Sequence, residues 1–253
     1  MAGTDKTETP IQGGPAIILV RPQLGQNIGM VARAMLNCGL TELRLVAPRD
    51  GWPNPDAEAS AAGATSVLAQ ARVFPTTAEA VADLQRVYAT TARTRDMTNI
   101  VETPRQAADG MKTAVAAGQS VGVQFGPERA GLLNDDISLA DTIIEVPLNP
   151  AFSSLNLAQA VLLIGYEWFQ ASDTSPAREL ITAGNRPATK GELVNFFVRL
   201  EKALEESGFL YPPEKTPIML RNIRNLFQRA DLTEQEVNTL HGIVSALWDK
   251  RRN

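Results

Sequence analysis

Asn27, Gly29 and Arg33 are the first residues whose types and spacing could do chemistry. They stand where a polar loop, which follows the apolar run 16–20, enters a helical pattern. We expect Asn27 to cap this helix through its side-chain oxygen, and we expect Gly29 to let another backbone come close. Arg33 lies about two turns further along and off the apolar face, so it is either a solvated surface residue or a cation available for binding.

A second group, Gly126 and Glu128, forms a turn directly after the apolar run 121–125. The carboxyl ends of strands are where open α/β sheets bind ligands. Gly126 could let a flat ligand approach the backbone, and Glu128 could orient an arginine through a charge-assisted contact. A plain turn with an exposed glutamate explains this pair as well.

A third group, Ser153, Ser154 and Asn156, follows the run 142–146 and precedes another helical pattern. We expect Ser153 or Ser154 to cap that helix, with Asn156 in its first turn. Free backbone amides at a helix start could instead hold a ligand carboxylate or polarise a hydroxyl group. Capping and ligand binding both remain open here.

The elements that must position these groups alternate between strand-like and helix-like patterns. Strands are predicted at residues 16–20, 43–47, 87–91, 121–125 and 142–146. Helices are predicted at residues 28–37, 56–69, 77–84, 105–117 and 154–170. This alternation predicts an α/β fold with a mostly parallel sheet that is covered by helices.

The chain divides into four parts by composition. Residues 1–15 are typical of a loose tail, and residues 16–170 form the α/β domain. Residues 171–188 are rich in Ser, Thr, Gly, Pro and Ala and read as a linker. Residues 189–253 carry helical patterns at 190–207, 217–230 and 233–252, which predict a small all-helical extension.

Composition excludes several kinds of site. A single cysteine, Cys38, and a single histidine, His241, exclude a disulfide framework, a Cys/His zinc site and a Cys-His nucleophilic pair. No apolar run approaches the roughly 18 residues of a membrane span, and residues 1–15 lack the features of a signal peptide, so we expect a cytoplasmic protein. The net charge of −4 counts against a nucleic-acid partner unless the basic residues gather on one face.

Taken together, the three polar groups resemble the three motifs of the TrmH-like branch of the SPOUT RNA methyltransferases. The matching segments are 27–33 (Asn-x-Gly-x-x-x-Arg), 126–132 (Gly-Pro-Glu-x-x-Gly-Leu) and 154–156 (Ser-Leu-Asn). The resemblance spans residues 17–168. The run 90–95 (Thr-Thr-Ala-Arg-Thr-Arg) and the helical extension favour a tRNA-modifying subgroup.

The resemblance implies a C-terminal trefoil knot that forms the pocket for S-adenosyl-L-methionine (AdoMet), a homodimer, and no metal requirement. The reaction implied is methyl transfer to a ribose 2'-hydroxyl of tRNA, at cytidine or uridine in anticodon-loop position 32. The residues implied in binding AdoMet are Thr90, Thr91, Ala92, Gly126, Val146, Leu148, Ser154, Leu155 and Asn156.

Arg33 is the implied catalytic residue, although a guanidinium with a pKa above about 12 makes a poor base. We therefore expect it to bind an RNA phosphate and to stabilise an alkoxide-like oxygen. Ser154 and Asn156 would hold the ribose, while Asn27 and Glu128 would support the arginine.

Arg93 and Arg95 are the further candidates for RNA contact, besides Arg33. Three alternatives stay open. The chain could be a SPOUT 2'-O-methyltransferase of rRNA or of another tRNA site, a knotted RNA-binding protein without activity, or a small-molecule α/β enzyme.

Overall fold

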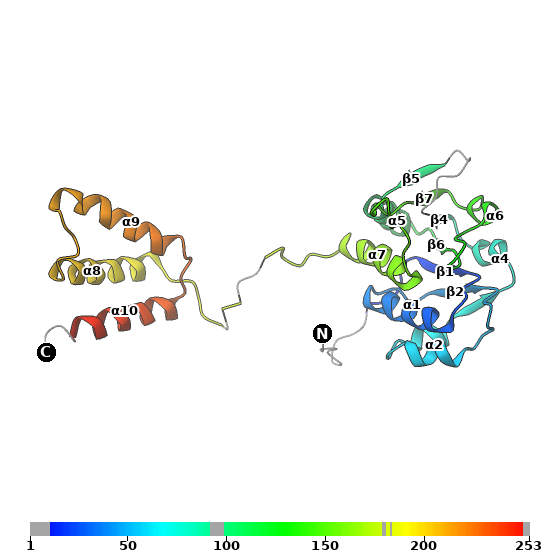
Figure 1. Ribbon diagram of the computed structural model, residues 1–253, viewed down its shortest axis with the longest axis horizontal. Coiled ribbons are helices and arrows are strands. Elements are labelled where there is room, and N and C mark those ends of the chain that lie inside the picture. The colour runs from blue at the N-terminus through cyan, green and yellow to red at the C-terminus, as the bar shows by residue number, and fades with distance from the viewer. Residues whose placement is uncertain (1–10, 92–98, 179–180, 183, 250–253) are drawn as a thin grey trace. The chain divides into compact units, whose positions relative to one another are not determined.

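The computed structural model describes residues 11–91, 99–178, 181–182 and 184–249. It divides into two compact units, Met1–Thr174 and Ser175–Asn253. Figure 1 labels the helices and strands of both units.

A seven-stranded sheet forms the centre of the first unit. The strands are β1 (Ala16–Val20), β2 (Leu43–Val46), β3 (Arg72–Phe74), β4 (Arg86–Thr90), β5 (Ile100–Glu102), β6 (Val121–Phe125) and β7 (Thr142–Ile144). They lie in the order β3-β2-β1-β6-β4-β7-β5, and every pairing is parallel. The predicted mostly parallel sheet is confirmed. β1 and β6 lie at its centre and are buried throughout, and their sequences are apolar except for Gln124 in β6.

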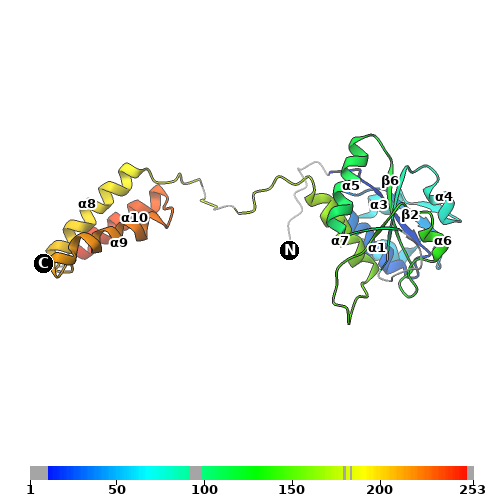
Figure 2. The ribbon, with the colours of Figure 1, turned by 90° about the horizontal axis from the view of Figure 1, so that it is seen from above.

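Helices cover both faces of this sheet. They are α1 (Gly25–Asn37), α2 (Pro55–Ser60), α3 (Thr65–Ala69), α4 (Thr77–Val81), α5 (Pro104–Ala116), α6 (Asn134–Ile137) and α7 (Leu157–Gln170). The larger core lies under α1, α5 and α7, where Met35, Met111 and Ile164 are buried, and the smaller core lies under α4 and α6. Figure 2 shows these two helical layers on opposite sides of the sheet.

Three local features depart from the sequence-based expectation. The strands β3 and β5 were not predicted, because three residues at or near a sheet edge, mostly exposed, carry no apolar pattern. The short helix α6 was not predicted either. The helix expected over 56–69 is two helices, since the backbone takes positive φ at Ala62 and Gly63.

The residues that cap α1 and α7 differ from those expected from the sequence. α1 begins at Gly25 with Leu24 in the cap position, so Asn27 lies inside the first turn and does not cap the helix. α7 begins at Leu157, and its cap is Asn156, whose side-chain oxygen accepts from the backbone N–H of Ala158 (2.9 Å). Ser153 and Ser154 therefore precede the cap and leave their hydroxyl groups free of that role.

The second unit contains α8 (Lys190–Glu206), a 3-10 turn η1 (Pro213–Lys215), α9 (Thr216–Gln228) and α10 (Glu234–Asp249). Its core is aromatic: the ring of Phe196 meets Phe227 and His241 edge to face at centroid distances of 5.0 and 5.5 Å. α8 starts with a capping box between Thr189 and Glu192. No helix in the described residues of either unit is long and apolar enough to cross a membrane.

Candidate active site

One chain of hydrogen bonds joins the three polar groups. Asn27 donates from Nδ2 to Oε1 of Glu128 (2.8 Å), and its Oδ1 accepts from Nδ2 of Asn156 (3.1 Å). The second oxygen of Glu128 accepts from the backbone N–H of Gln23 (3.0 Å). Asn27 is only 4% exposed, so its amide would be costly to bury without these partners. The loops after β1, β6 and β7 are thus fixed to one another through Asn27.

Arg33 takes no part in this chain. It lies on the exposed face of α1, and no hydrogen bond or ion pair joins it to another residue that the structure describes. The expected support from Asn27 and Glu128 is not found, because Arg33 stands six residues further along the helix and about 120° around its axis from the buried Asn27. Within the described ranges, Arg33 is therefore an unpaired cation on the surface of α1.

Gly29 packs α1 against α2. A Cβ atom there would lie 2.2 Å from the backbone oxygen of Ala57, so only glycine permits this helix contact. Within the segment 27–33, Asn27 joins loops and Gly29 joins helices. Of these three motif residues, only Arg33 has an exposed side chain.

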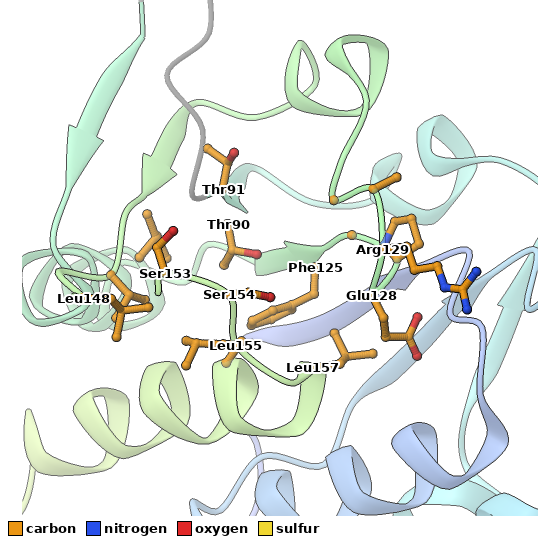
Figure 3. A pocket seen from close by; sticks show the side chains of 17 residues that line it. Thr90, Thr91, Phe125, Glu128, Arg129, Leu148, Ser153, Ser154, Leu155 and Leu157 are labelled. Atoms are coloured by element: carbon orange, nitrogen blue, oxygen red, sulfur yellow. The ribbon is translucent and has the colours of Figure 1, made fainter. Parts of the chain in front are cut away.

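A cavity of about 320 Å³ opens at the carboxyl ends of β4, β6 and β7. Figure 3 shows Leu148 and Ser153 at one end of it and Glu128 and Arg129 at the other. Seven of the residues expected to bind AdoMet line it: Thr90, Thr91, Gly126, Val146, Leu148, Ser154 and Leu155. The cavity lies at the sheet edge where α/β folds bind ligands.

Glu128 also lines the cavity, whereas the other predicted site residues that the structure describes are not among its lining. Asn156 does not line the cavity but caps the helix that follows it. Ala92, Arg93 and Arg95 lie outside the described residues. The sequence analysis missed Phe125 and Arg129, which also line the cavity, although both belong to the Gly-Pro-Glu segment or adjoin it.

Gly126 allows the loop after β6 to fold back on itself. A Cβ atom there would lie 2.2 Å from the backbone nitrogen of Leu132 and 2.3 Å from the carbonyl carbon of Gly131. Gly131 has a φ of +67°, and its N–H donates to the carbonyl of Pro127 (2.9 Å). The loop itself is therefore a close neighbour of Gly126, which also lines the cavity.

The cavity combines apolar walls with hydroxyl groups. Phe125, Leu148 and Leu155 supply apolar surface, and the hydroxyl of Thr90 donates to the carbonyl of Gln124 (2.9 Å). That bond leaves the oxygen of Thr90 able to accept a further donor. The site can therefore hold a ligand with both an apolar and a polar part. In the described ranges, no group of three His, Cys, Asp or Glu side chains is arranged to hold a metal ion.

Asp136, at α6, is a buried carboxylate that the sequence analysis missed. It is 5% exposed and forms an ion pair with Arg21. Burial by itself would raise the pKa of Asp136, but hydrogen bonds from Arg21, Thr77 and the N–H of Leu133 outweigh it and hold the pKa below its usual value. Asp136 is therefore charged at neutral pH.

Comparison with known families gives two matches along the chain. The SpoU rRNA Methylase family matches residues 14–166, and the C-terminal domain of the tRNA methyltransferase TrmJ matches residues 191–253.

Similar proteins match over nearly the whole length. The tRNA (cytidine/uridine/adenosine-2'-O-)-methyltransferase TrmJ of Pseudomonas aeruginosa is 35% identical over 90% of this chain and 91% of that protein. The tRNA (cytidine/uridine-2'-O-)-methyltransferase TrmJ of Klebsiella pneumoniae is 37% identical over 93% of this chain and 97% of that protein. The crystal structure of TrmJ from Z. mobilis has a TM-score of 0.82 and 53% identity, covering 93% of this chain and 100% of that one.

Proposed function

The chain belongs to the SpoU rRNA Methylase family, and we propose that it transfers a methyl group from AdoMet to a ribose 2'-hydroxyl of tRNA. The observation that carries this proposal is the hydrogen-bonded chain from Glu128 through Asn27 to Asn156, which assembles all three motif segments beside one cavity. tRNA is favoured over rRNA because residues 191–253 match the C-terminal domain of TrmJ and the relatives above are tRNA methyltransferases.

The residues present fit AdoMet. The cavity of about 320 Å³ offers apolar walls and hydroxyl groups, and it lies where parallel sheets bind ligands. AdoMet supplies a methyl group on a positively charged sulfur. We propose that the residues holding it are Thr90, Thr91, Ala92, Gly126, Val146, Leu148, Ser154, Leu155 and Asn156.

Arg33 is the proposed catalytic residue on the ribose side. Methyl transfer requires the 2'-oxygen to approach in line, so positioning supplies much of the rate. An arginine cannot readily take the hydroxyl proton, but its charge binds a phosphate and stabilises negative charge on the oxygen. Ser154 and Asn156 would hold the ribose. Asn27 and Glu128 keep the loops in place, and Arg93 and Arg95 are further candidates for RNA contact.

A homodimer is proposed as the active form. α7 exposes Leu162 (42%), Leu163 (37%) and Tyr166 (53%), and α1, which packs on α7, exposes Met30 (39%). Apolar side chains gathered on two adjoining helices favour burial against a second copy. Light scattering should give twice the chain mass, and Tyr166→Glu combined with Leu162→Glu should give the single mass.

The domain organisation completes the proposal. Residues 16–170 would carry the chemistry, 171–188 would be a linker, and 189–253 would be a helical extension. The trefoil knot would lie in the segment after β7, which adjoins the cavity. The site of action would be the cytoplasm, where tRNA is found.

Mapping of 2'-O-methyl groups tests the substrate. In cells that lack the gene, tRNA should lose the methyl group from cytidine and uridine at anticodon-loop position 32, while rRNA keeps its own. Loss from rRNA, or from another tRNA site, would favour the alternative substrates. Calorimetry on the purified protein tests the class of activity, since a failure to bind AdoMet would contradict a methyltransferase altogether.

A further inference from the structure

Asp136 lies outside the cavity, yet it holds one end of the loop that lines it. Its Oδ2 accepts from the backbone N–H of Leu133 (3.0 Å), and its Oδ1 accepts from the hydroxyl of Thr77 in α4 (2.7 Å). Leu133 stands two residues after the end of the cavity-lining segment 126–131. The carboxylate therefore fixes the far end of that segment to α4.

Arg21, the ion-pair partner of Asp136, lies at the end of β1. Its backbone has a φ of +48°, a conformation that non-glycine residues seldom adopt, so surrounding contacts must maintain it. Its N–H donates to the carbonyl of Val46 (2.8 Å), and its guanidinium bonds both oxygens of Asp136. The ion pair thus ties the loop after β1 to the loop after β6.

The two loops are consequently joined at two places. At the near end, Glu128 accepts from Gln23 and Asn27, and at the far end Asp136 accepts from Arg21 and Leu133. The first attachment lies within the cavity-lining segment 126–131 and the second lies just beyond its end. A segment ordered in advance loses less conformational entropy when a ligand binds, which raises affinity.

We propose that Arg21 and Asp136 are positioning residues that hold the loop 126–133 in its ligand-binding shape. This role rests on the proposed function, because the ligand concerned is AdoMet. It does not depend on contact with the cofactor, since neither side chain lines the cavity. Both act through the backbone of the loop.

The first test replaces Asp136 with asparagine. The variant keeps the side-chain shape, but its amide group would face the donors that now surround a carboxylate. Hydrogen exchange on the protein without AdoMet should show faster exchange of the backbone N–H groups at 128–133. Calorimetry should show AdoMet binding weakened about tenfold, because one charge-assisted hydrogen bond corresponds to about that factor.

Asp83→Asn is the matched control. Asp83 also pairs with an arginine, Arg44, but this ion pair lies between β2 and the end of α4, away from the cavity. The control should change AdoMet affinity less than about twofold and leave exchange at 128–133 unchanged. A general loss of stability would instead affect both variants alike.

Arg21→Gln provides an independent variant if Asp136→Asn fails to fold. If the two residues act as a pair, the double variant should bind AdoMet no more weakly than the worse single one. Unchanged exchange and unchanged affinity in either folded variant would overturn the proposal. If the wild-type protein does not bind AdoMet, the proposed function fails, whereas the exchange measurement still decides whether the ion pair orders the loop.

Discussion

Replacing Asn27 with aspartate tests the hydrogen-bonded chain at its centre. Asn27 donates to Oε1 of Glu128 at 2.8 Å, so the substitution would place two carboxylates in contact at a position only 4% exposed. Two like charges that close cannot both persist, and one carboxyl group takes up a proton. The acceptor role toward Asn156 survives, so the effect isolates the contact with Glu128.

The loss of folding stability in Asn27→Asp follows from the need to keep one of the two carboxyl groups protonated. Keeping a carboxyl group with an ordinary pKa near 4 protonated costs about 1.4 kcal/mol per pH unit, or about 4 kcal/mol at pH 7 and about 1.4 kcal/mol at pH 5. The folded state binds more protons than the unfolded state over this range, so the stability of the variant falls as pH rises. We therefore expect the deficit against wild type to grow by about 2.5 kcal/mol from pH 5 to pH 7.

Urea unfolding at both pH values measures this deficit. A Trp248→Phe background leaves Trp52 and Trp168 as the only tryptophans, so fluorescence reports the first unit alone. Asn54→Asp is the control, because the side-chain oxygen of Asn54 caps α2 and an aspartate there does the same. The role assigned to Asn27 would be refuted if the free energy of unfolding fell by less than about 1 kcal/mol at pH 7, or if its decrease did not change with pH.

Three further predictions concern other parts of the chain. Arg33→Ala should lower turnover by about 10² or more while AdoMet binding stays unchanged, with the exposed Arg105→Ala as control; equal turnover would remove Arg33 from catalysis. Gly126→Ala should weaken AdoMet binding more than about tenfold in calorimetry, since its Cβ would meet Leu132 at 2.2 Å. Hydrogen bonds from Arg186 and from the N–H of Thr189 lower the pKa of Glu192 to about 2. The ionised Glu192 therefore stabilises the start of α8, and this stabilisation should be lost as pH falls from 4.5 toward 2. The helical circular dichroism signal of the wild type should therefore decrease over this pH range, and in Glu192→Gln this decrease should be absent.

The central part of the fold could be predicted from the sequence because burial leaves a clear pattern. The runs 16–20 and 121–125 coincide with β1 and β6, whose residues are all buried. The short strands β3 and β5 could not be found, because mostly exposed three-residue strands have no such pattern. Their positions depend on the neighbouring strands with which they pair.

The candidate site could be predicted in part for a similar reason. The motif residues indicate which loops meet, and most of the expected AdoMet residues do line one cavity. The roles of individual side chains could not be predicted as well from the sequence. Asn27 was expected to cap a helix, but its partners Glu128 and Asn156 come from distant segments. The pair of Arg21 and Asp136 gave no local signal, because 115 residues separate its members.

The connections through Asn27 also affect how the protein matures. Its two partners lie 101 and 129 residues further along the chain, so both contacts close very long loops. Such contacts, like the pairing of β1 with β6, join distant segments of the chain and are therefore slow to form. A nascent chain therefore cannot complete the site until Asn156 has left the ribosome. Products that end before that residue should be inactive, even where their sheet has already formed.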